Sequence, residues 1–370
     1  MQRRNSLSTL LLAFVAILSL AASPPRHPQL NLAPSPVVEE GGRRSLQKRD
    51  GDFQGYSQES YAADMALAKE AGIAAFAMNV GNDDSDADQL AKAFAAAEAS
   101  GFALFYSFDM NYFSSPGSSD KISSTYMPFA ASSAYYTVDD KLLVSTFSGE
   151  TSGTFLDGAN GFEESNAKWK TMLDSAAVTL GKEIAFAPDW NDVSLVPQQK
   201  YGGGIMSWAA WGEKGRTDDM TTAGDETYLS AAQENGLFYI APVAAFFFVH
   251  VAAGNNYVLQ SDWLLPKHYT DLINLENGPQ FVELLSWNDF GESHYLGPLR
   301  DDAGVPGAAA TYANTDHDHT DALAERVLQL LVYRRLSTLD NVGMHHLVFP
   351  PASRRRNRLL RMSSNGSVRS

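Results

Sequence analysis

The chain has 370 residues, of which 44% are hydrophobic, so it can bury a full-sized core and is not a disordered protein. Its formal net charge is -15, which argues against nucleic acid and acidic lipid as partners, because both are negatively charged. It contains no cysteine, so no disulfide stabilises it and a large buried core must hold the fold.

The N-terminal segment has the pattern of a secretory signal. Arg3 and Arg4 precede an apolar run of about a dozen residues, and small residues follow before Pro24. We therefore expect residues 1–22 to be a signal peptide, cleaved near Ala21 or Ala22. The mature protein should be secreted, to the extracellular space or the cell wall, without a membrane span. Residues 23–55 are Pro-rich and have no period, which predicts an unstructured leader or linker.

Residues 56–332 repeat one unit, in which a helix-like stretch ends in glycine and an apolar run of strand length follows. The clearest helices are predicted at residues 61–72 and 89–101. Near-continuous apolar strands covered by helices indicate a parallel sheet. About 250 to 280 residues of such units favour a (β/α)8 barrel of the TIM type over an open doubly wound sheet. The seven predicted strands are 73–79, 102–110, 142–150, 183–190, 205–211, 239–243 and 281–287.

Both ends of this domain are irregular. Residues 43–55 are charged and Gly-rich and cannot form a strand, so the first strand of the barrel is expected to be missing or replaced. Residues 333–370 carry eight arginines and a single acid, Asp340, with no helical or strand period. We expect this segment to be a basic, disordered tail or the product of a misplaced splice junction.

The predicted strands end in polar and aromatic residues, at the position where barrel enzymes carry their active sites. Carboxylates with tryptophan faces favour glycoside hydrolysis, which needs one carboxyl group to protonate the leaving oxygen and another to activate water. No Gly-rich phosphate loop or nucleophile elbow is present, so we expect neither a cofactor nor acyl transfer. The candidate residues are Asn79, Asp109, Tyr112, Glu150, Asp189, Trp190, Trp208, Trp211, His250, Trp287, Asn288, Asp289, Glu292, His294 and Tyr295.

Three further features of the sequence have a structural explanation as well as a functional one. The run DHDH at residues 316–319 is the only cluster that resembles a metal site, but no third group of ligands can be placed beside it, so no metal is expected. Trp169 lies on a helix-like stretch and is expected in the core. For His250 and His294, a contact to a sugar hydroxyl and a structural role both remain open.

The motifs of residues 56–298 resemble those of the fungal α-1,3-glucanases, or mutanases, of glycoside hydrolase family 71. The resemblance rests on FYSFDMNYFS, FAPDW, IMSWAAW and above all FVELLSWNDFGESHYLGP. It implies a secreted enzyme that cleaves α-1,3-glucan internally, with inversion, on a (β/α)8 barrel. It also implies that Asp289 and Glu292 are catalytic and that Asp109 is a third acidic position. We prefer Asp289 as the acid and Glu292 as the base.

The chain departs from the family pattern where Phe246 replaces a tryptophan and where the closing helix gives way to the tail. One alternative is therefore a glucan-binding wall protein without activity. Another is a misassembled gene model of an active family member. In each case the expected partner is α-1,3-glucan, and the protein is assumed to be a monomer.

Overall fold

The computed structural model describes residues 13–19, 55–83, 85–212, 220–245, 247–250, 256–259, 264–301, 305, 309–314 and 319. For residues 13–19, 250 and 256–259 we describe the backbone only. The expected basic tail, Phe246 and nearly all of the expected leader lie outside these ranges.

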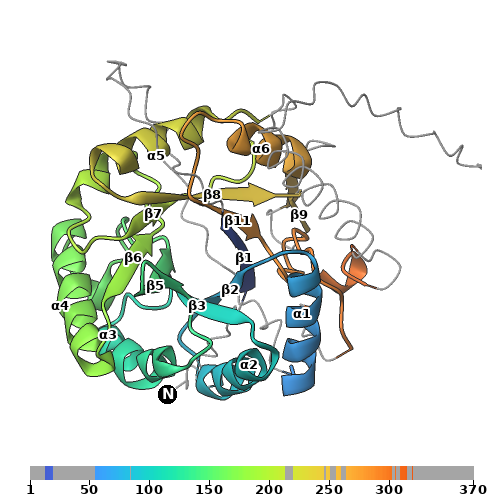
Figure 1. Ribbon diagram of the computed structural model, residues 1–370, viewed down its shortest axis with the longest axis horizontal. Helices are drawn as coiled ribbons and strands as arrows, with labels where there is room; N and C mark the ends of the chain where they lie inside the picture. Colours follow the sequence, from blue (N-terminus) through green and yellow to red (C-terminus); the bar gives the residue numbers. More distant parts are fainter. Residues whose placement is uncertain are drawn as a thin grey trace, which may run out of the picture. The chain divides into compact units, whose positions relative to one another are not determined.

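Helices and strands alternate along most of the described chain (Figure 1). The helices are α1 (Gln58–Glu70), α2 (Asp86–Ser100), α3 (Ser118–Lys121), α4 (Phe162–Leu180), α5 (Ala223–Glu234) and α6 (Leu264–Ile273). The strands are β1 (Ala13–Ser19), β2 (Ala75–Val80), β3 (Ala103–Asp109), β4 (Thr137–Val138), β5 (Lys141–Phe147), β6 (Ile184–Pro188), β7 (Gly204–Met206), β8 (Phe238–Ala244), β9 (Phe247–His250), β10 (Asn256–Leu259) and β11 (Phe281–Leu285).

The seven predicted strands are present and run parallel, which confirms an α/β fold with a parallel sheet. The pairs β2–β3, β3–β5 and β5–β6 are parallel, as are β7–β8 and β8–β11. Two isolated parallel bridges, Phe186 to Gly203 and Asp189 to Met206, join the β6 and β7 segments. The strands lie around a common interior, and the long helices lie outside them (Figure 1).

Strand β1 occupies the place between β2 and β11 where the sequence predicted no first strand. β1 lies between β2 and β11 and is antiparallel to both. Ile17 is opposite Ala75 on one side and Glu283 on the other. Because β1 comes from the segment expected to be the signal peptide, cleavage of residues 1–22 and this pairing cannot both hold for one molecule. The cleavage itself stays a prediction.

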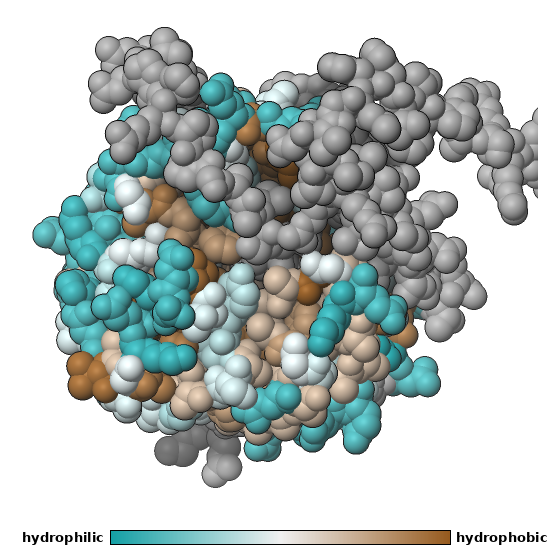
Figure 2. Space-filling model, viewed as in Figure 1, coloured by the Kyte–Doolittle hydropathy of each residue, from teal (hydrophilic) through white to brown (hydrophobic). Residues whose placement is uncertain are grey.

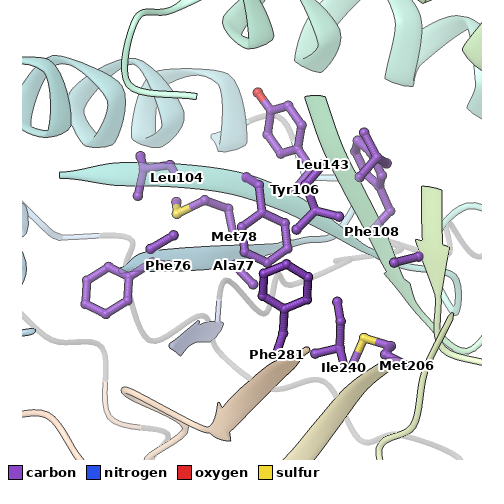
Figure 3. Close-up of a cluster of buried hydrophobic side chains, with 14 of the residues drawn as sticks. Phe76, Ala77, Met78, Leu104, Tyr106, Phe108, Leu143, Met206, Ile240 and Phe281 are labelled. Atoms are coloured by element: carbon purple, nitrogen blue, oxygen red, sulfur yellow. The ribbon is translucent and has the colours of Figure 1, made fainter. Parts of the chain in front are cut away.

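Contacts to the helices identify the two faces of each strand. Tyr106 of β3 packs on Phe94 of α2, and its hydroxyl donates to the carbonyl of Tyr126. Phe186 of β6 packs on Trp169 of α4, which is 4% exposed, so the predicted core position of Trp169 is confirmed. Since side chains alternate along a strand, the neighbours of these residues face the interior. Figure 3 shows part of this apolar packing, in which Phe281, Ile240 and Met206 come from adjacent strands.

Glycine ends the helices that precede strands, as the pattern predicted. Gly101 and Gly181 follow α2 and α4 with φ of 63° and 65°, a conformation that side chains with a Cβ adopt at a cost. The turns direct the next residues back toward the sheet.

On the face shown in Figure 2, hydrophilic side chains gather over α4, and apolar ones lie nearer the centre.

A buried ion pair ties α1 to the segment after β11. Arg300 Nε donates to Asp64 at 2.6 Å, and the Tyr56 hydroxyl donates to the same carboxylate at 2.9 Å. Burial raises the pKa of Asp64, and Arg300 opposes that shift.

None of the helices in the described part of the chain combines the length and apolar character needed to cross a bilayer.

Candidate active site

The loop after β11 carries the motif with the most candidate residues. Hydrogen bonds within the loop and from β9 fix its conformation. The Asp289 amide donates to the Ser286 hydroxyl oxygen at 2.9 Å, and the Glu292 amide donates to Asp289 Oδ1 at 2.8 Å. The Ser286 amide bonds the His294 carbonyl at 3.0 Å, which closes the loop. The amide of Phe248 in β9 donates to the Glu292 carbonyl at 3.0 Å. The loop is therefore fixed from both its ends and its side.

Asp289, Glu292 and His294 meet on this loop. His294 Nε2 lies 3.4 Å from Asp289 Oδ2 and 3.4 Å from Glu292 Oε2. Asp289 is 3% exposed and His294 2%, whereas the Glu292 side chain is 15% exposed. The contacting atoms of the three side chains lie within 4.8 Å of one another. The two carboxylates are therefore close neighbours, and Glu292 is the one that solvent reaches more easily.

The end of β3 carries Asp109, which faces the interior together with Ser107. Asp109 is 3% exposed, and its Oδ1 accepts from both the amide and the side-chain nitrogen of Asn111, at 3.0 and 2.8 Å. Asn79 of β2 is directly opposite Ser107 and is 2% exposed. Tyr112, three residues beyond Asp109, is half-buried. The carboxyl ends of β2 and β3 therefore gather the polar groups that the sequence indicated there.

The ends of β5 and β6 bring a second pair of carboxyl groups together. Glu150 accepts from the amide and side chain of Asn191 at 3.2 and 3.0 Å, and Asp189 accepts from the Ser148 amide at 3.2 Å. Asp189 is fully buried, and burial followed by the nearby Glu150 charge raises its pKa well above the usual value. The Asp189 carboxyl group therefore keeps its proton to a higher pH than an exposed aspartate would. Its side chain does not face solvent.

Glu283 on β11 is a polar interior residue that the sequence reading did not select. It pairs with Pro242 of β8, is fully buried, and neither carboxyl oxygen has a hydrogen-bond partner among the described residues. Burial, with a smaller contribution from Asp189, raises the pKa of Glu283 to about 8. A single acid inside the apolar run FVELL was the signal that could have identified it.

The four tryptophans at strand ends divide into two pairs. Trp190 and Trp287 are 3% and 1% exposed; they pack on Phe162 and on Phe76. Neither presents a free indole face. Trp208 and Trp211 are partly exposed, and Trp211 packs on His294 with ring centroids 5.0 Å apart. Of these four tryptophans, Trp208 and Trp211 therefore keep an accessible surface, and Trp211 is the one in contact with the loop after β11.

The remaining candidates flank the loop. Asn288 is 1% exposed, and Tyr295 is fully buried against Phe290. His319 stacks on Tyr295 with centroids 3.9 Å apart, while residues 316–318 lie outside the described residues. His250 ends β9 opposite Asn256, and its side chain is not described. Tyr295 thus anchors the loop from behind rather than lining an open surface.

Asp289, Glu292 and His294 are also the one group of three potential metal ligands found close together in the described part of the chain. Two carboxylates and an imidazole suit several divalent cations. The same three groups can instead donate and accept protons around a polar substrate. Asp109 lies apart from them on β3, which β2 and β1 separate from β11 in the sheet.

Comparison with known proteins identifies the relatives of the chain. The family model described as glycosyl hydrolase family 71 matches residues 50–336. The glucan endo-1,3-alpha-glucosidase agn1 of Schizosaccharomyces pombe is 31% identical over 274 residues, which are 73% of this chain and 61% of the relative. A mutanase of Penicillium rubens is 30% identical over 273 residues, covering 72% of this chain and 56% of the relative. The chain thus spans less than two thirds of the length of either relative.

Solved structures agree on the fold. The GH99 endo-alpha-mannosidase from Bacteroides thetaiotaomicron aligns with a TM-score of 0.54 at 12% sequence identity, covering 78% of this chain and 86% of that one. A second structure of that enzyme, in complex with bis-tris-propane, gives a TM-score of 0.52 at 12% identity and covers 80% of this chain and 88% of that one. At this identity the likeness shows a shared fold alone.

Proposed function

The chain belongs to glycosyl hydrolase family 71, and from this premise we propose that it hydrolyses α-1,3-glucosidic bonds within glucan. The observation that carries the proposal is the meeting of Asp289, Glu292 and His294 at the carboxyl end of β11. The names of the relatives, a glucan endo-1,3-alpha-glucosidase and a mutanase, supply the substrate class.

The chemistry requires two carboxyl groups in different states. We assign Asp289 as the acid that protonates the leaving oxygen and Glu292 as the base that takes a proton from water. Asp109 orients the sugar or tunes the pair from β3. The water oxygen then bonds to the anomeric carbon as the glycosidic bond breaks, and the two protons are accounted for by Asp289 and Glu292. The higher exposure of Glu292 supports its role beside the entering water.

Stereochemistry is a separate part of the proposal. Inverting enzymes separate their carboxyl groups by about 6.5 to 9.5 Å, and retaining enzymes by about 5 to 5.5 Å. The contacting oxygens of Asp289 and Glu292 lie within 4.8 Å of each other. We keep inversion as the proposal, in which the water enters beside the carboxyl oxygens that do not face His294, while the two oxygens on His294 stay together. Proton NMR of the first product tests this, because a β anomer supports inversion and an α anomer overturns it.

Substrate contacts are assigned by exposure. We propose that Trp208, Trp211 and Tyr112 stack on glucosyl rings, because each is partly exposed beside the strand ends. Asn79, Glu150, Asp189, Trp190, Trp287, Asn288 and Tyr295 then act as supports for these contacts and for the loop. His250 is kept as a sugar contact.

The closure of the sheet into a barrel and the location of the protein outside the cell are also proposals. We propose that in the uncleaved chain β1, β2, β3, β5, β6, β7, β8 and β11 close into a (β/α)8 barrel, which the β6–β7 bridges and the pairing of β1 support. Export to the cell wall, which would remove β1 with residues 1–22, is supported by the signal-like N-terminus and by a relative named ascus wall endo-1,3-alpha-glucanase.

The test is release of reducing ends from insoluble α-1,3-glucan by the purified full chain, with α-1,4- and β-1,3-glucans beside it. Asp289→Asn and Glu292→Gln should each lower the rate by roughly 10²- to 10⁴-fold. Glu163→Gln, on the exposed first turn of α4, is the matched control. A folded protein that sediments with the polymer but releases nothing would support the binding-protein alternative and refute hydrolysis.

A further inference from the structure

We propose that His294 is a positioning residue that holds Asp289 and Glu292 together through a single proton on its Nε2 atom. The proposal deepens the proposed function, and its kinetic consequence rests on that function. Its structural content concerns only the loop after β11 and can be tested without activity.

The first support is that both carboxylates lie equally near one ring nitrogen. His294 Nε2 is 3.4 Å from Glu292 Oε2, with hydrogen-bond geometry, and 3.4 Å from Asp289 Oδ2. An N–H shared between two acceptors makes longer bonds than one directed at a single acceptor, and such three-centre bonds are common. The ring of His294 also contacts the rings of Trp211 and Phe247, which carry no charge.

The second support is the other ring nitrogen. His294 Nδ1 is buried and has no hydrogen-bond partner in the described part of the chain. A neutral imidazole carries its proton on one nitrogen and a lone pair on the other. A buried N–H without an acceptor is costly, and Nε2 faces two acceptors. The proton therefore belongs on Nε2, between the carboxylates.

The third support is that the ring cannot easily turn away. Phe247 of β9 stacks on it with centroids 5.6 Å apart and planes 25° apart, and Trp211 approaches at 5.0 Å from the segment after β7. The His294 carbonyl accepts from the Ser286 amide at 3.0 Å, so the backbone is fixed as well. Three segments of the chain thus set the direction of one N–H.

The consequence of losing this donor follows from charge. In the proposed active state Asp289 carries a proton and Glu292 a negative charge, and their contacting oxygens lie within 4.8 Å of each other. Without the N–H of His294 the proton of Asp289 can pass to Glu292, and the acid and base lose their set directions. The rate of the chemical step should fall, while sugar binding by other residues changes little.

The kinetic test compares His294→Gln with His294→Leu. Glutamine can place an N–H near the position of Nε2, whereas leucine cannot. We expect kcat of His294→Leu to fall at least 100-fold with KM within threefold of the wild type, and His294→Gln to retain activity within about tenfold. His268→Gln, at a buried histidine bonded to Asp225 between α5 and α6, is the matched control. Equal loss in both His294 variants, or full activity of His294→Leu, would overturn the proposal.

The structural test uses protein labelled with ¹⁵N-histidine, in which the His294 signals are those missing from His294→Gln. We expect a protonated Nε2 whose shift changes in both Asp289→Asn and Glu292→Gln. An unprotonated Nε2, or a response to only one of the carboxylate variants, would overturn the proposal. If the wild type releases no reducing ends but the Nε2 result is as expected, the proposed function fails and the positioning of the pair stands. Where His294→Leu does not fold, His294→Ala with added imidazole replaces it, and absence of rescue then counts against the proposal.

Discussion

Replacing Glu283 by glutamine should make the stability of the protein less dependent on pH. Glu283 is fully buried on β11 and has no hydrogen-bond partner for either oxygen among the described residues. Its pKa is raised from 4.5 to about 8, first by burial and then by Asp189. The folded protein therefore keeps a proton on Glu283 at a pH where the unfolded chain has lost it. Glutamine has a similar shape and stays neutral at every pH.

The sign and size follow from proton linkage. Below pH 4.5 both states hold the proton, and above pH 8 neither does. Between these values the folded state holds more protons than the unfolded state, so the free energy of unfolding falls as pH rises, by about 1.4 kcal/mol per pH unit. Over the whole window the wild type loses roughly 3 to 5 kcal/mol from this one group. Glu283→Gln should not show that loss.

The assay is guanidinium-induced unfolding of both proteins at pH 5, 6, 7 and 8. We expect the difference in free energy of unfolding, variant minus wild type, to grow with pH by about 1 kcal/mol per unit or more. Any cost of burying the glutamine amide is the same at each pH and cancels from the slope. Glu70→Gln, at the exposed end of α1, is the matched control and should give a flat difference. A flat difference for Glu283→Gln would refute the account of this buried acid.

Three further outcomes follow from the structure. Arg300→Met should lower the free energy of unfolding at pH 7 by about 3 kcal/mol in a denaturant titration, because Asp64, 1% exposed, loses its cation; an unchanged midpoint would contradict this. Gly297→Ala should destabilise the loop after β11, since an added Cβ would lie 2.5 Å from Trp287 Nε1; a melting temperature equal to that of the wild type would show that the tryptophan moves freely. Dialysis against EDTA should leave reducing-end release unchanged, because the proposed chemistry needs carboxyl groups and water alone; a loss restored by Zn²⁺ would assign Asp289, Glu292 and His294 to a metal.

The strands and their polar ends could be predicted because both depend on local pattern. A helix closed by Gly101 or Gly181 and followed by an apolar run has few other solutions, and the carboxyl ends of parallel strands necessarily meet. The grouping of Asp289 and Glu292 followed from their spacing on one loop. Both features depend on residues that are close together in the sequence.

Other features depend on contacts that no local pattern records. Trp190 and Trp287 follow strands as Trp208 and Trp211 do, yet only the packing on Phe162 and Phe76 makes the first pair core residues. The hairpin of β9 and β10 was not predicted, although β9 contributes Phe247 to the site. That His294 lies between both carboxylates depends on the backbone turn at Ser293, where φ is 61°.

In any one molecule, residues 13–19 act either as part of a targeting segment or as strand β1 of the sheet. As a targeting segment it would be cut away with residues 1–22, and β2 and β11 would then face each other across a slot one strand wide, about 10 Å between their axes. Each side of the slot would present unpaired amides and carbonyls in register with the other. A mature, exported molecule of this kind would be an acceptor for a foreign strand, and a free peptide with the sequence AFVAILS would become its ligand.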